Sequence, residues 1–515
     1  MSVRVILLGE APLSIEDVVD VAKRRATVRL SESSYFQERI VRGSLLLDRI
    51  LEEDGQIYGV TTGYGDSCTV DIPANLVWEL PIQLTRFHGC GTGRHLSVEA
   101  SRALMVARLV SLCRGYSGIS MPLLKLLATF IDKDIVPLIP EEGSVGASGD
   151  LTPLSYLAAA LIGERQVSVD GIIRESRDVL GELGLTPHTL RPKEGLALMN
   201  GTAAMTGLAC IAFARAEYLA KLASRITSLA TLALKGNAFH FSKELFDLKP
   251  HPGQMQVAYW IRSDLEHEEM PRNPMRLQDR YSIRCAPHVI GVLVDALPYF
   301  RSQIETELNS TNDNPIIDPD HELVLHGGHF YGGHIAFVMD SMKNAVANIA
   351  DLLDCQMALL VDTKYNNGLP ANLTGAEPAR AMINHGFKGV QIGVSACTAE
   401  ALKLTMPASV FSRSTECHNQ DKVSMGMIAA RDCMRILELS EQVAAAVLLA
   451  VVQALELRLR AGELDRRHIV PALLEMKDSV FSDFAFLTDD RPLEGELRYF
   501  TSQIQDRAWK LYDEV

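Results

Sequence analysis

The sequence is short of basic residues. Its 50 Lys and Arg residues are outnumbered by 64 Asp and Glu residues, which gives a formal net charge of -14. No block of Lys and Arg interleaved with aromatic residues occurs anywhere in the chain. Because nucleic acids and anionic membranes bind basic surfaces, this composition argues against either as the main partner. Nucleic acid is therefore set aside.

Patterned cysteines and long apolar runs are also missing. The nine Cys residues are scattered without any Cys-x-x-Cys pair, which is typical of a reducing compartment and predicts neither a disulfide framework nor a zinc site. The first apolar run, Val5 to Leu8, is too short for the core of a signal peptide. The longest, Val443 to Val452, falls below the ~18 residues of a membrane span. We therefore expect a soluble, cytoplasmic protein that does not bind membranes.

Strand signals are sparse, whereas three segments have the features of unusually long helices. The weak strand signals lie at residues 3–8, 167–173 and 323–325, without the alternation of strands and helices that a parallel α/β fold requires. The long helical segments are residues 203–235, 334–361 and 424–461. Since ordinary helices average about 11–12 residues, these segments predict a bundle of long helices.

The domain organisation follows from this contrast. Residues 1–200 carry more Gly and loop signals and are predicted to form a mixed N-terminal part. Residues 201–515 are predicted to form the helical bundle and C-terminal helices. The run Val443 to Val452 indicates a helix that is covered on every side, as occurs inside a bundle or at a subunit interface.

A loop of small residues, Gly143-Ser-Val-Gly-Ala-Ser-Gly-Asp150, precedes a predicted helix. A phosphate loop would need a Lys after the glycines, and a nucleophile elbow would need Gly where Asp150 follows Ser148 by two residues. The plain alternative is a structural turn. A chemical interpretation also exists, because the Gly149 nitrogen can attack the Ala147 carbonyl carbon where the backbone bends sharply. Loss of two water molecules, one from Ser148, would leave an imidazolone ring with an electrophilic methylidene group.

The loop and the helix after it are similar to the signature of the ammonia-lyase and aminomutase family of histidine, phenylalanine and tyrosine ammonia-lyases. The cofactor of that family is this ring, 4-methylidene-imidazole-5-one (MIO). Other segments match in the family's order, from about Tyr58 to Met425: Tyr58-Gly-Val-Thr-Thr-Gly-Tyr-Gly65, Lys193-Glu-Gly-Leu-Ala-Leu-Met-Asn-Gly-Thr202, Gln278-Asp-Arg-Tyr-Ser-Ile-Arg-Cys285, Tyr365-Asn-Asn-Gly-Leu-Pro370 and His418-Asn-Gln-Asp421. The resemblance implies an MIO formed autocatalytically from Ala147-Ser148-Gly149, with no metal and no external cofactor.

The resemblance also implies roles for individual residues. Tyr58, on a mobile lid, corresponds to the base that removes the β-proton, and we expect a lowered pKa there from nearby positive dipoles and burial. Arg284 would hold the substrate carboxylate through two parallel hydrogen bonds. The alternatives without a catalytic role are that Tyr58 is a tyrosine of the core and that Arg284 forms a surface salt bridge. The other expected site residues are Asn200 and Gln278, which would orient the prosthetic group and the carboxylate, together with Tyr281, Phe330 and Gln420.

Three histidines near Phe330 suggest a metal site only at first sight. His326, His329 and His334 are separated by glycines, so no helix spaces them, and no acidic ligand is adjacent. We therefore expect no metal. The family usually has Asn where His329 stands, and often Asn where Thr61 stands.

The choice of substrate depends on two positions. Gln420 stands where the family's histidine enzymes have an acidic residue, which argues against histidine as substrate. The pair Phe87-His88 occupies the family's ring-binding position. His88 could hydrogen-bond a para-hydroxyl group, and a buried hydroxyl without a partner costs about 1–3 kcal/mol. A preference for tyrosine of roughly 10–100-fold follows. Alternatively, His88 only packs, and the pocket accepts phenylalanine.

The resemblance therefore implies a mainly α-helical protein of the fumarase/aspartase-like superfamily, assembled as a homotetramer with shared active sites. The expected reaction is the conversion of L-tyrosine to p-coumarate and ammonia. The alternatives within the family are a phenylalanine ammonia-lyase that forms trans-cinnamate and a tyrosine 2,3-aminomutase, with a histidine ammonia-lyase less favoured. A catalytically dead scaffold is disfavoured because Tyr58, Ser148, Asn200 and Arg284 are all present.

Overall fold

The computed structural model describes residues 4–53, 55–267, 272–273 and 276–512. The chain divides into two compact units. Unit 1 comprises residues 1–214, 300–340 and 407–431, and unit 2 comprises residues 215–299, 341–406 and 432–515. The single boundary after residue 200 that the sequence suggested does not describe this division. The reason is that four long helices each contribute residues to both units, so the chain passes between the units several times.

Unit 1 begins with a parallel strand pair, β1 (Arg4–Leu8) and β2 (Ala26–Leu30), which confirms the first strand signal. Between them, α1 (Ile15–Ala22) starts at Ser14, whose side chain accepts a hydrogen bond from the Asp17 N–H in a capping box. This helix packs against α4 (Val98–Cys113), which is buried along almost its whole length. The two helices form one side of the apolar core of unit 1.

Three shorter helices of unit 1 pack against one another beside the candidate site. They are α3 (Leu80–Phe87), α6 (Leu151–Leu161) and α8 (Glu194–Met199), and each contacts the other two. Their ends supply part of the candidate site, and loops and turns supply the rest. Helix α6 is the helix expected after the small-residue loop, and it is apolar and buried because both neighbours cover it. The remaining helices of unit 1 include α2 (Ser34–Glu52), the 3-10 turn η1 (Gly65–Thr69) and α5 (Met121–Asp132).

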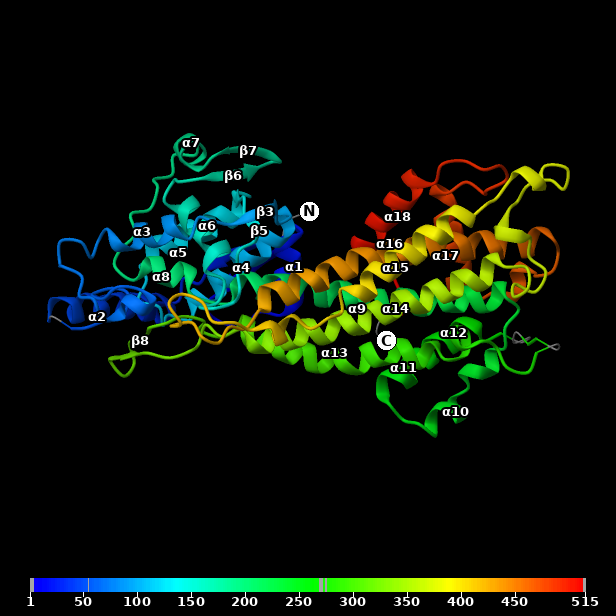
Figure 1. The fold of residues 1–515 in the computed structure, drawn as a ribbon, viewed down its shortest axis with the longest axis horizontal. Helices are drawn as coiled ribbons and strands as arrows, with labels where there is room; N and C mark the ends of the chain where they lie inside the picture. Colours follow the sequence, from blue (N-terminus) through cyan, green and yellow to red (C-terminus); the bar gives the residue numbers. More distant parts are fainter. Residues whose placement is uncertain (1–3, 54, 268–271, 274–275, 513–515) are drawn as a thin grey trace. The chain divides into compact units, whose positions relative to one another are not determined.

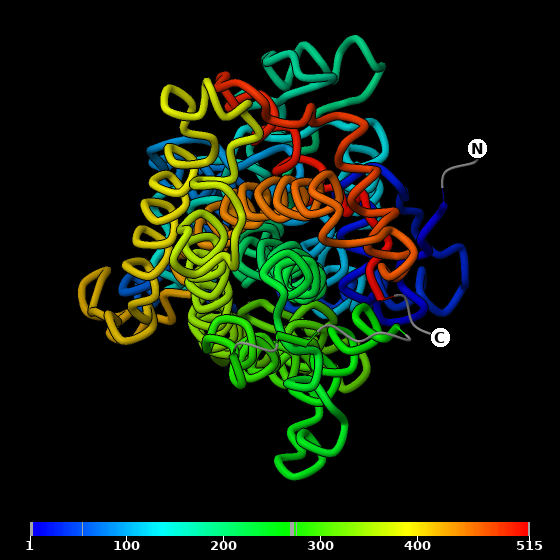
Figure 2. The backbone as a smooth tube through the Cα atoms, turned by 90° about the vertical axis from the view of Figure 1, so that its right-hand side faces the viewer, coloured from blue at the N-terminus to red at the C-terminus, as the bar shows by residue number. Residues whose placement is uncertain are grey.

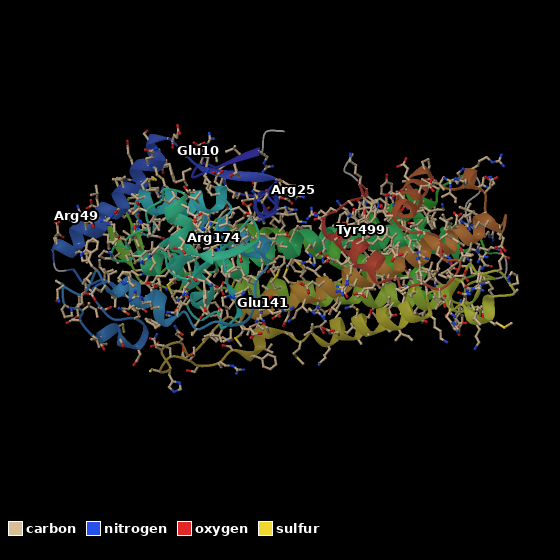
Figure 3. All side chains as sticks on the ribbon, turned by 90° about the horizontal axis from the view of Figure 1, so that it is seen from above. Glu10, Arg25, Arg49, Glu141, Arg174 and Tyr499 are labelled. Carbon is tan, nitrogen blue, oxygen red and sulfur yellow. The ribbon has the colours of Figure 1, made fainter. Side chains whose placement is uncertain are left out.

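The other strands of unit 1 form small antiparallel sheets: β3 (Thr92–His95) with β5 (Pro140–Glu142), β8 (Ile316–Asp318) with β9 (Leu323–Leu325), and β4 (Val136–Pro137) with β6 (Gln166–Val169) and β7 (Ile172–Glu175). Both remaining strand signals are thereby confirmed. The β6–β7 hairpin leads into α7 (Ser176–Glu182), beside which it lies in Figure 1. Arg174 of β7, labelled in Figure 3, forms an ion pair with Glu182 of α7.

Unit 2 is built from parts of the long helices, which confirms the predicted bundle. These helices are α9 (Ala203–Ala233), α13 (Ala286–Leu308), α14 (Gly333–Val361) and α16 (Gly426–Arg460). Figure 2 looks along the unit 2 portions of α9 (green) and α16 (orange), which therefore appear as coils. Within unit 2, Arg215 of α9 donates hydrogen bonds to Glu441 of α16 at 2.8 and 2.6 Å. The amide of Gln356 in α14 donates to the hydroxyl of Thr227 in α9 at 2.9 Å.

Shorter helices complete unit 2: α10 (Lys243–Asp247), α11 (Pro252–Leu265), α12 (Tyr281–Arg284), α15 (Lys388–Lys403), α17 (Pro471–Asp483) and α18 (Glu494–Gln505). Single 3-10 turns occupy Ala238–Phe241, Ala371–Leu373, Ala381–Ile383 and Arg466–His468, and a further one in unit 1 occupies Ala408–Phe411.

The apolar character of the long helices exceeds what the uninterrupted runs suggested. Within the described part of the chain, three helices are apolar enough, by length and composition alone, to cross a membrane: Tyr281–Leu308, Gly333–Val361 and Gly426–Arg460. The expectation that no segment reaches that length is therefore wrong, because isolated polar residues interrupt the runs without lowering the mean hydropathy much. In the last of these helices, 78% of the apolar window is buried inside the protein. Residues Val443 to Val452 are all buried, which confirms a helix covered on every side.

Candidate active site

The small-residue loop bends at Gly149, where the backbone adopts φ +69°. There the chain is bonded on both sides to Gly201: the Gly201 N–H donates to the Ser148 carbonyl at 3.2 Å, and the Asp150 N–H donates to the Gly201 carbonyl at 2.8 Å. A Cβ atom on Gly149 would overlap the Gly201 carbonyl group. Only glycine therefore fits at position 149, as the ring-forming interpretation requires.

Asp150 anchors this loop beneath the site. Its carboxylate accepts hydrogen bonds from the Ser144 hydroxyl at 2.9 Å and from the Met205 N–H at 2.8 Å. Burial raises the pKa of Asp150 to about 7, against the lowering effect of these hydrogen bonds. The loop is thus tied through one buried carboxyl group to the first turn of α9.

A cavity of about 380 Å³ lies over Ser148. Within the part of the chain that the structure describes, every residue that lines this cavity belongs to unit 1. These residues come from the segment that starts at Tyr58, the ends of α3 and α8, the start of α6 and the loop before α16. The lining residues are Tyr58, Gly63, Tyr64, Gly65, Ser67, Leu84, Phe87, His88, Ser148, Leu151, Leu196, Asn200, Glu416 and Gln420.

Two amide side chains line the same cavity as Ser148. The Gln420 amide nitrogen lies 3.3 Å from the Ser148 hydroxyl oxygen, to which it donates. The side-chain oxygen of Asn200 is buried and has no hydrogen-bond partner within the part of the chain that the structure describes. A buried polar atom without a partner is costly, which indicates that a further polar group belongs beside it. The glycine-only bend and these two amides fit an MIO group at residues 147–149.

Tyr58 also lines the cavity, and its hydroxyl oxygen accepts a hydrogen bond from the Gly65 N–H at 2.7 Å. Burial raises the pKa of Tyr58 above its usual value, the Gly65 N–H lowers it, and the negative charge of Glu416 raises it further. The expectation of a lowered pKa is therefore wrong for this arrangement, because the single N–H dipole does not outweigh burial and a neighbouring carboxylate.

The predicted ring-binding pair lies at the C-terminal end of α3. The rings of Phe87 and His88 have centroids 4.3 Å apart, and the ring of Tyr64 lies 6.4 Å from that of Phe87. The Nδ1 atom of His88 is 3.1 Å from the Leu84 carbonyl oxygen. Because a carbonyl oxygen can only accept, Nδ1 carries the proton in this contact, and in the neutral ring Nε2 is an acceptor. Burial lowers the pKa of His88, which favours this neutral form.

The structure brings together six of the residues that the sequence singled out: Tyr58, Phe87, His88, Ser148, Asn200 and Gln420. Ala147 and Gly149 flank Ser148 in the chain. Phe330 belongs to unit 1 and is half-buried, but it is not part of the described lining.

Gln278, Tyr281 and Arg284 belong to unit 2 and are likewise absent from the described lining. The Arg284 Nε–H donates to the Asp279 carbonyl oxygen at 2.9 Å, and the guanidinium lies 4.6 Å from the ring centroid of Tyr281. The side chain of Tyr281 is 71% exposed.

Sequence reasoning missed two lining residues with distinctive chemistry. Tyr64 lies within the quoted segment 58–65, and its spacing from Tyr58 carried no separate signal. Glu416 lies four residues before Gln420, where a carboxylate close to a predicted site amide could have been noticed. Three consecutive residues, Glu416, Cys417 and His418, have left-handed backbone conformations, and this turn directs Glu416 into the cavity.

The histidines before α14 were expected not to bind a metal, and this stays a prediction. His326, His329 and His334 are all exposed. Among the residues that the structure describes, there is no group of three or more His, Cys, Asp or Glu side chains that could hold a metal ion.

Comparisons with known proteins find similar enzymes over most of the chain. The aromatic amino acid lyase family matches residues 13–475 of this chain. A tyrosine 2,3-aminomutase from Chondromyces crocatus is 38% identical over 502 residues, which cover 93% of this chain and 92% of that protein. The human histidine ammonia-lyase is 37% identical, over 86% of this chain and 68% of that protein. The crystal structure of a tyrosine aminomutase from Streptomyces globisporus has a TM-score of 0.89 at 32% identity, over 97% of each chain.

Proposed function

Because this chain belongs to the aromatic amino acid lyase family and is a carbon–nitrogen lyase, we propose that it converts L-tyrosine to p-coumarate and ammonia. The observation that carries the proposal is His88, a neutral imidazole whose Nε2 accepts hydrogen bonds, in the lining of the same cavity as Ser148 and Tyr58. A para-hydroxyl group can donate to that nitrogen, whereas the plain ring of phenylalanine leaves it without a partner.

The prosthetic group proposed here is an MIO formed from Ala147, Ser148 and Gly149. When formed, it supplies an electrophilic carbon that makes the substrate's amino group a better leaving group. The amides of Asn200 and Gln420 orient it, because both line the cavity of Ser148, Gln420 donates to the Ser148 hydroxyl, and the buried Asn200 oxygen is free to accept. Phe87 and Leu84 exclude water from the aromatic end of the substrate.

Tyr58 removes the β-proton in this proposal. The Gly65 N–H, 2.7 Å from its oxygen, stabilises the phenolate once it forms. Burial keeps the hydroxyl protonated at neutral pH, so only a minor fraction of the enzyme is in the reactive form. Glu416 faces the same space and is suited to the positive charge of the substrate's amino group.

The substrate carboxylate still needs a cation, and we propose that Arg284 of a second copy of the chain supplies it. Arg284 and Tyr281 belong to the unit that contributes no described lining residue. Unit 2 also exposes large apolar side chains, including Val292 at 60%, Ile392 at 67% and Met382 at 81%. Exposed apolar surface of this kind is typical of a subunit interface. A homotetramer with shared active sites accounts for both features.

A second function, tyrosine 2,3-aminomutase, is favoured by the names of two relatives. The Chondromyces protein and the Streptomyces structure are both tyrosine aminomutases. An aminomutase uses the same residues but returns the amino group to the β-carbon. A phenylalanine ammonia-lyase is the remaining alternative, and the apolar face of Phe87 would favour it if His88 only packs.

The test is to incubate the purified protein separately with L-tyrosine, L-phenylalanine and L-histidine. The near-UV absorbance of the conjugated product is followed, and the products are also separated by chromatography. A rise with tyrosine well above phenylalanine supports the proposal. A rise only with phenylalanine contradicts the role of His88, and β-tyrosine as the main product assigns the aminomutase reaction.

A further inference from the structure

Arg165 adopts a backbone conformation that arginine rarely takes. Its φ is +62°, in the left-handed region where a Cβ atom crowds the following carbonyl group. It lies between α6 and β6, and its side chain is half-buried. A residue held in such a conformation persists only where the surrounding contacts fix it, so the contacts of its side chain indicate what that position does.

The guanidinium of Arg165 fastens the C-terminal end of α3. Its Nη2 donates to the Thr85 carbonyl oxygen at 2.6 Å, in the last turn of that helix, where a cation is favoured. It also packs against Gly89, because a Cβ atom there would overlap the guanidinium. Gly89 is the first residue of the glycine-containing run that follows the ring-binding pair. This contact explains why residue 89 has no side chain.

A second contact reaches His88 itself. The Nη1 of Arg165 donates to the Ser155 hydroxyl oxygen at 3.1 Å. That hydroxyl donates its single hydrogen to two carbonyl oxygens, that of His88 at 3.1 Å and that of Thr152 at 2.7 Å, in a shared hydrogen bond. Arg165 therefore holds the residues on both sides of Phe87, one directly and one through Ser155.

The position of these contacts links the ring pocket to the reacting atoms. Helix α6 starts directly after the Ser148 loop, carries Ser155 in its second turn, and is followed by Arg165. The guanidinium also lies 4.2 Å from the ring centroid of Tyr156, which limits its freedom. Residues 148–165 therefore form one continuous segment that begins at the Ser148 loop and ends at Arg165, which contacts the helix end that carries His88.

We propose that Arg165, acting with Ser155, is a positioning residue for substrate selection: it fixes Phe87 and His88 at the distance from Ser148 that suits a para-hydroxylated ring. This inference rests on the proposed use of His88 as the hydroxyl partner. It assigns Arg165 no contact with substrate.

The experiment compares the kcat/KM for tyrosine with that for phenylalanine, counting all products formed, in the full-length enzyme. In Arg165→Met the side chain keeps a similar length but loses its donors. We expect the tyrosine-to-phenylalanine ratio to fall about tenfold, the effect of one misplaced hydrogen bond, while the near-UV absorbance of the prosthetic group is retained. Using a ratio removes any loss of folded enzyme, because both substrates report on the same preparation.

The neighbouring residue supplies the matched control. Glu164 pairs with Arg86 of α3 at 2.7 Å, but the arginine side chain is 54% exposed. Glu164→Gln removes this surface ion pair beside the same helix end and should leave the ratio within about twofold, since exposed pairs contribute little. Should Arg165→Met fail to fold, Ser155→Ala removes the hydroxyl that connects Arg165 to the His88 carbonyl but keeps the Arg165 contact with Thr85, and we expect a smaller fall in the ratio.

Several outcomes overturn the proposal. An unchanged tyrosine-to-phenylalanine ratio in Arg165→Met shows a purely structural role, whether or not kcat/KM falls equally for both substrates. If Arg165→Met does not fold, an unchanged ratio in Ser155→Ala shows the same. His88→Leu separates the inference from the proposed function. If His88→Leu lowers the ratio but Arg165→Met does not, the inference is wrong and the proposed function stands. If His88→Leu leaves the ratio unchanged, the proposed role of His88 is wrong, whatever Arg165 does.

Discussion

The carboxylate of Glu416 accepts hydrogen bonds from the backbone N–H of Asp66 at 3.1 and 3.2 Å. The two residues are 350 positions apart in the chain. Asp66 follows Gly65, whose own N–H donates to the Tyr58 hydroxyl oxygen. Glu416 therefore fixes the segment that stabilises the Tyr58 phenolate, while its negative charge opposes formation of that phenolate. Glu416 thus both binds the segment after Tyr58 and raises the pKa of the proposed base.

The pH dependence of activity should follow from the raised pKa of Tyr58. Proton abstraction needs the phenolate, and burial holds the pKa of Tyr58 above its usual value of about 10. The kcat/KM should therefore increase with pH from 7 to 10, by up to about tenfold per pH unit. Stopped assays in a constant-ionic-strength buffer series measure this profile. A plateau already reached at pH 7 would contradict Tyr58 as a base with a raised pKa.

Replacing Glu416 with Gln should move this profile to lower pH. Removal of the carboxylate charge takes away one of the causes that raise the pKa of Tyr58, so the phenolate forms more readily. We expect the rising limb to shift downward in pH even if the maximal rate falls. Glu182→Gln, at an exposed pair with Arg174, serves as the control and should leave the profile in place. A shift to higher pH would show that Glu416 acts mainly by ordering the lid.

Alanine at position 149 should abolish activity. Its Cβ atom would overlap the Gly201 carbonyl, and the left-handed φ of +69° adds about 1–2 kcal/mol of strain. We expect no near-UV absorbance from the prosthetic group and a lower Tm. The control is Gly181→Ala in α7, where a Cβ meets nothing within 4 Å and helix propensity should raise stability by about 0.5–1 kcal/mol. An active Gly149→Ala enzyme would refute the glycine requirement.

Substitution of Ser148 by Ala removes the hydroxyl that would leave as water when the ring forms. We expect kcat to fall by about 10³-fold or more, with the near-UV absorbance of the prosthetic group lost. Circular dichroism should show unchanged helix content, because the Ser148 side chain makes one hydrogen bond of 3.3 Å, to Gln420. Full activity in this variant would eliminate an MIO at this loop.

Shared active sites predict rescue between two inactive variants. Ser148→Ala and Arg284→Ala should each be inactive when expressed alone. When the two chains are co-expressed, some sites in mixed oligomers combine an intact Ser148 from one chain with an intact Arg284 from another, and activity should reappear. If each site is formed within one chain, every site carries a defect, and co-expression gives no more activity than the single variants.

The buried pair of Lys193 and Asp313 should be important for stability. The Lys193 ammonium lies 2.6 Å from the Asp313 carboxylate, and both side chains are fully buried at the start of α8, the helix that ends at Asn200. Lys193→Met leaves Asp313 buried without its ion-pair partner, so we expect a loss of about 3–5 kcal/mol in urea unfolding. Lys243→Met, at the exposed pair with Asp247, should cost less than about 0.5 kcal/mol.

The sequence by itself determined the fold class and the central chemistry. Long apolar segments predicted the helices now seen as α9, α14 and α16, because helix periodicity and length are local properties of the chain. The run around Ser148 was informative for a similar reason: the proposed ring uses three consecutive residues, so no distant contact is needed to recognise it. The match of Asn200 and Gln420 to a family pattern placed both in the same site, and the structure confirms that they share one cavity.

Only the tertiary structure decided the pKa values, tautomers and positions of these residues. The pKa of Tyr58 depends on burial and on Glu416, which is 358 positions away in sequence and reaches the lid through a left-handed turn. The tautomer of His88 depends on a carbonyl oxygen one helical turn before it, and the helix end that carries His88 is bonded by Arg165, which comes from a different segment of the chain. Electrostatic and steric effects act through space over a few ångströms, and the distances between remote segments exist only once the chain has folded.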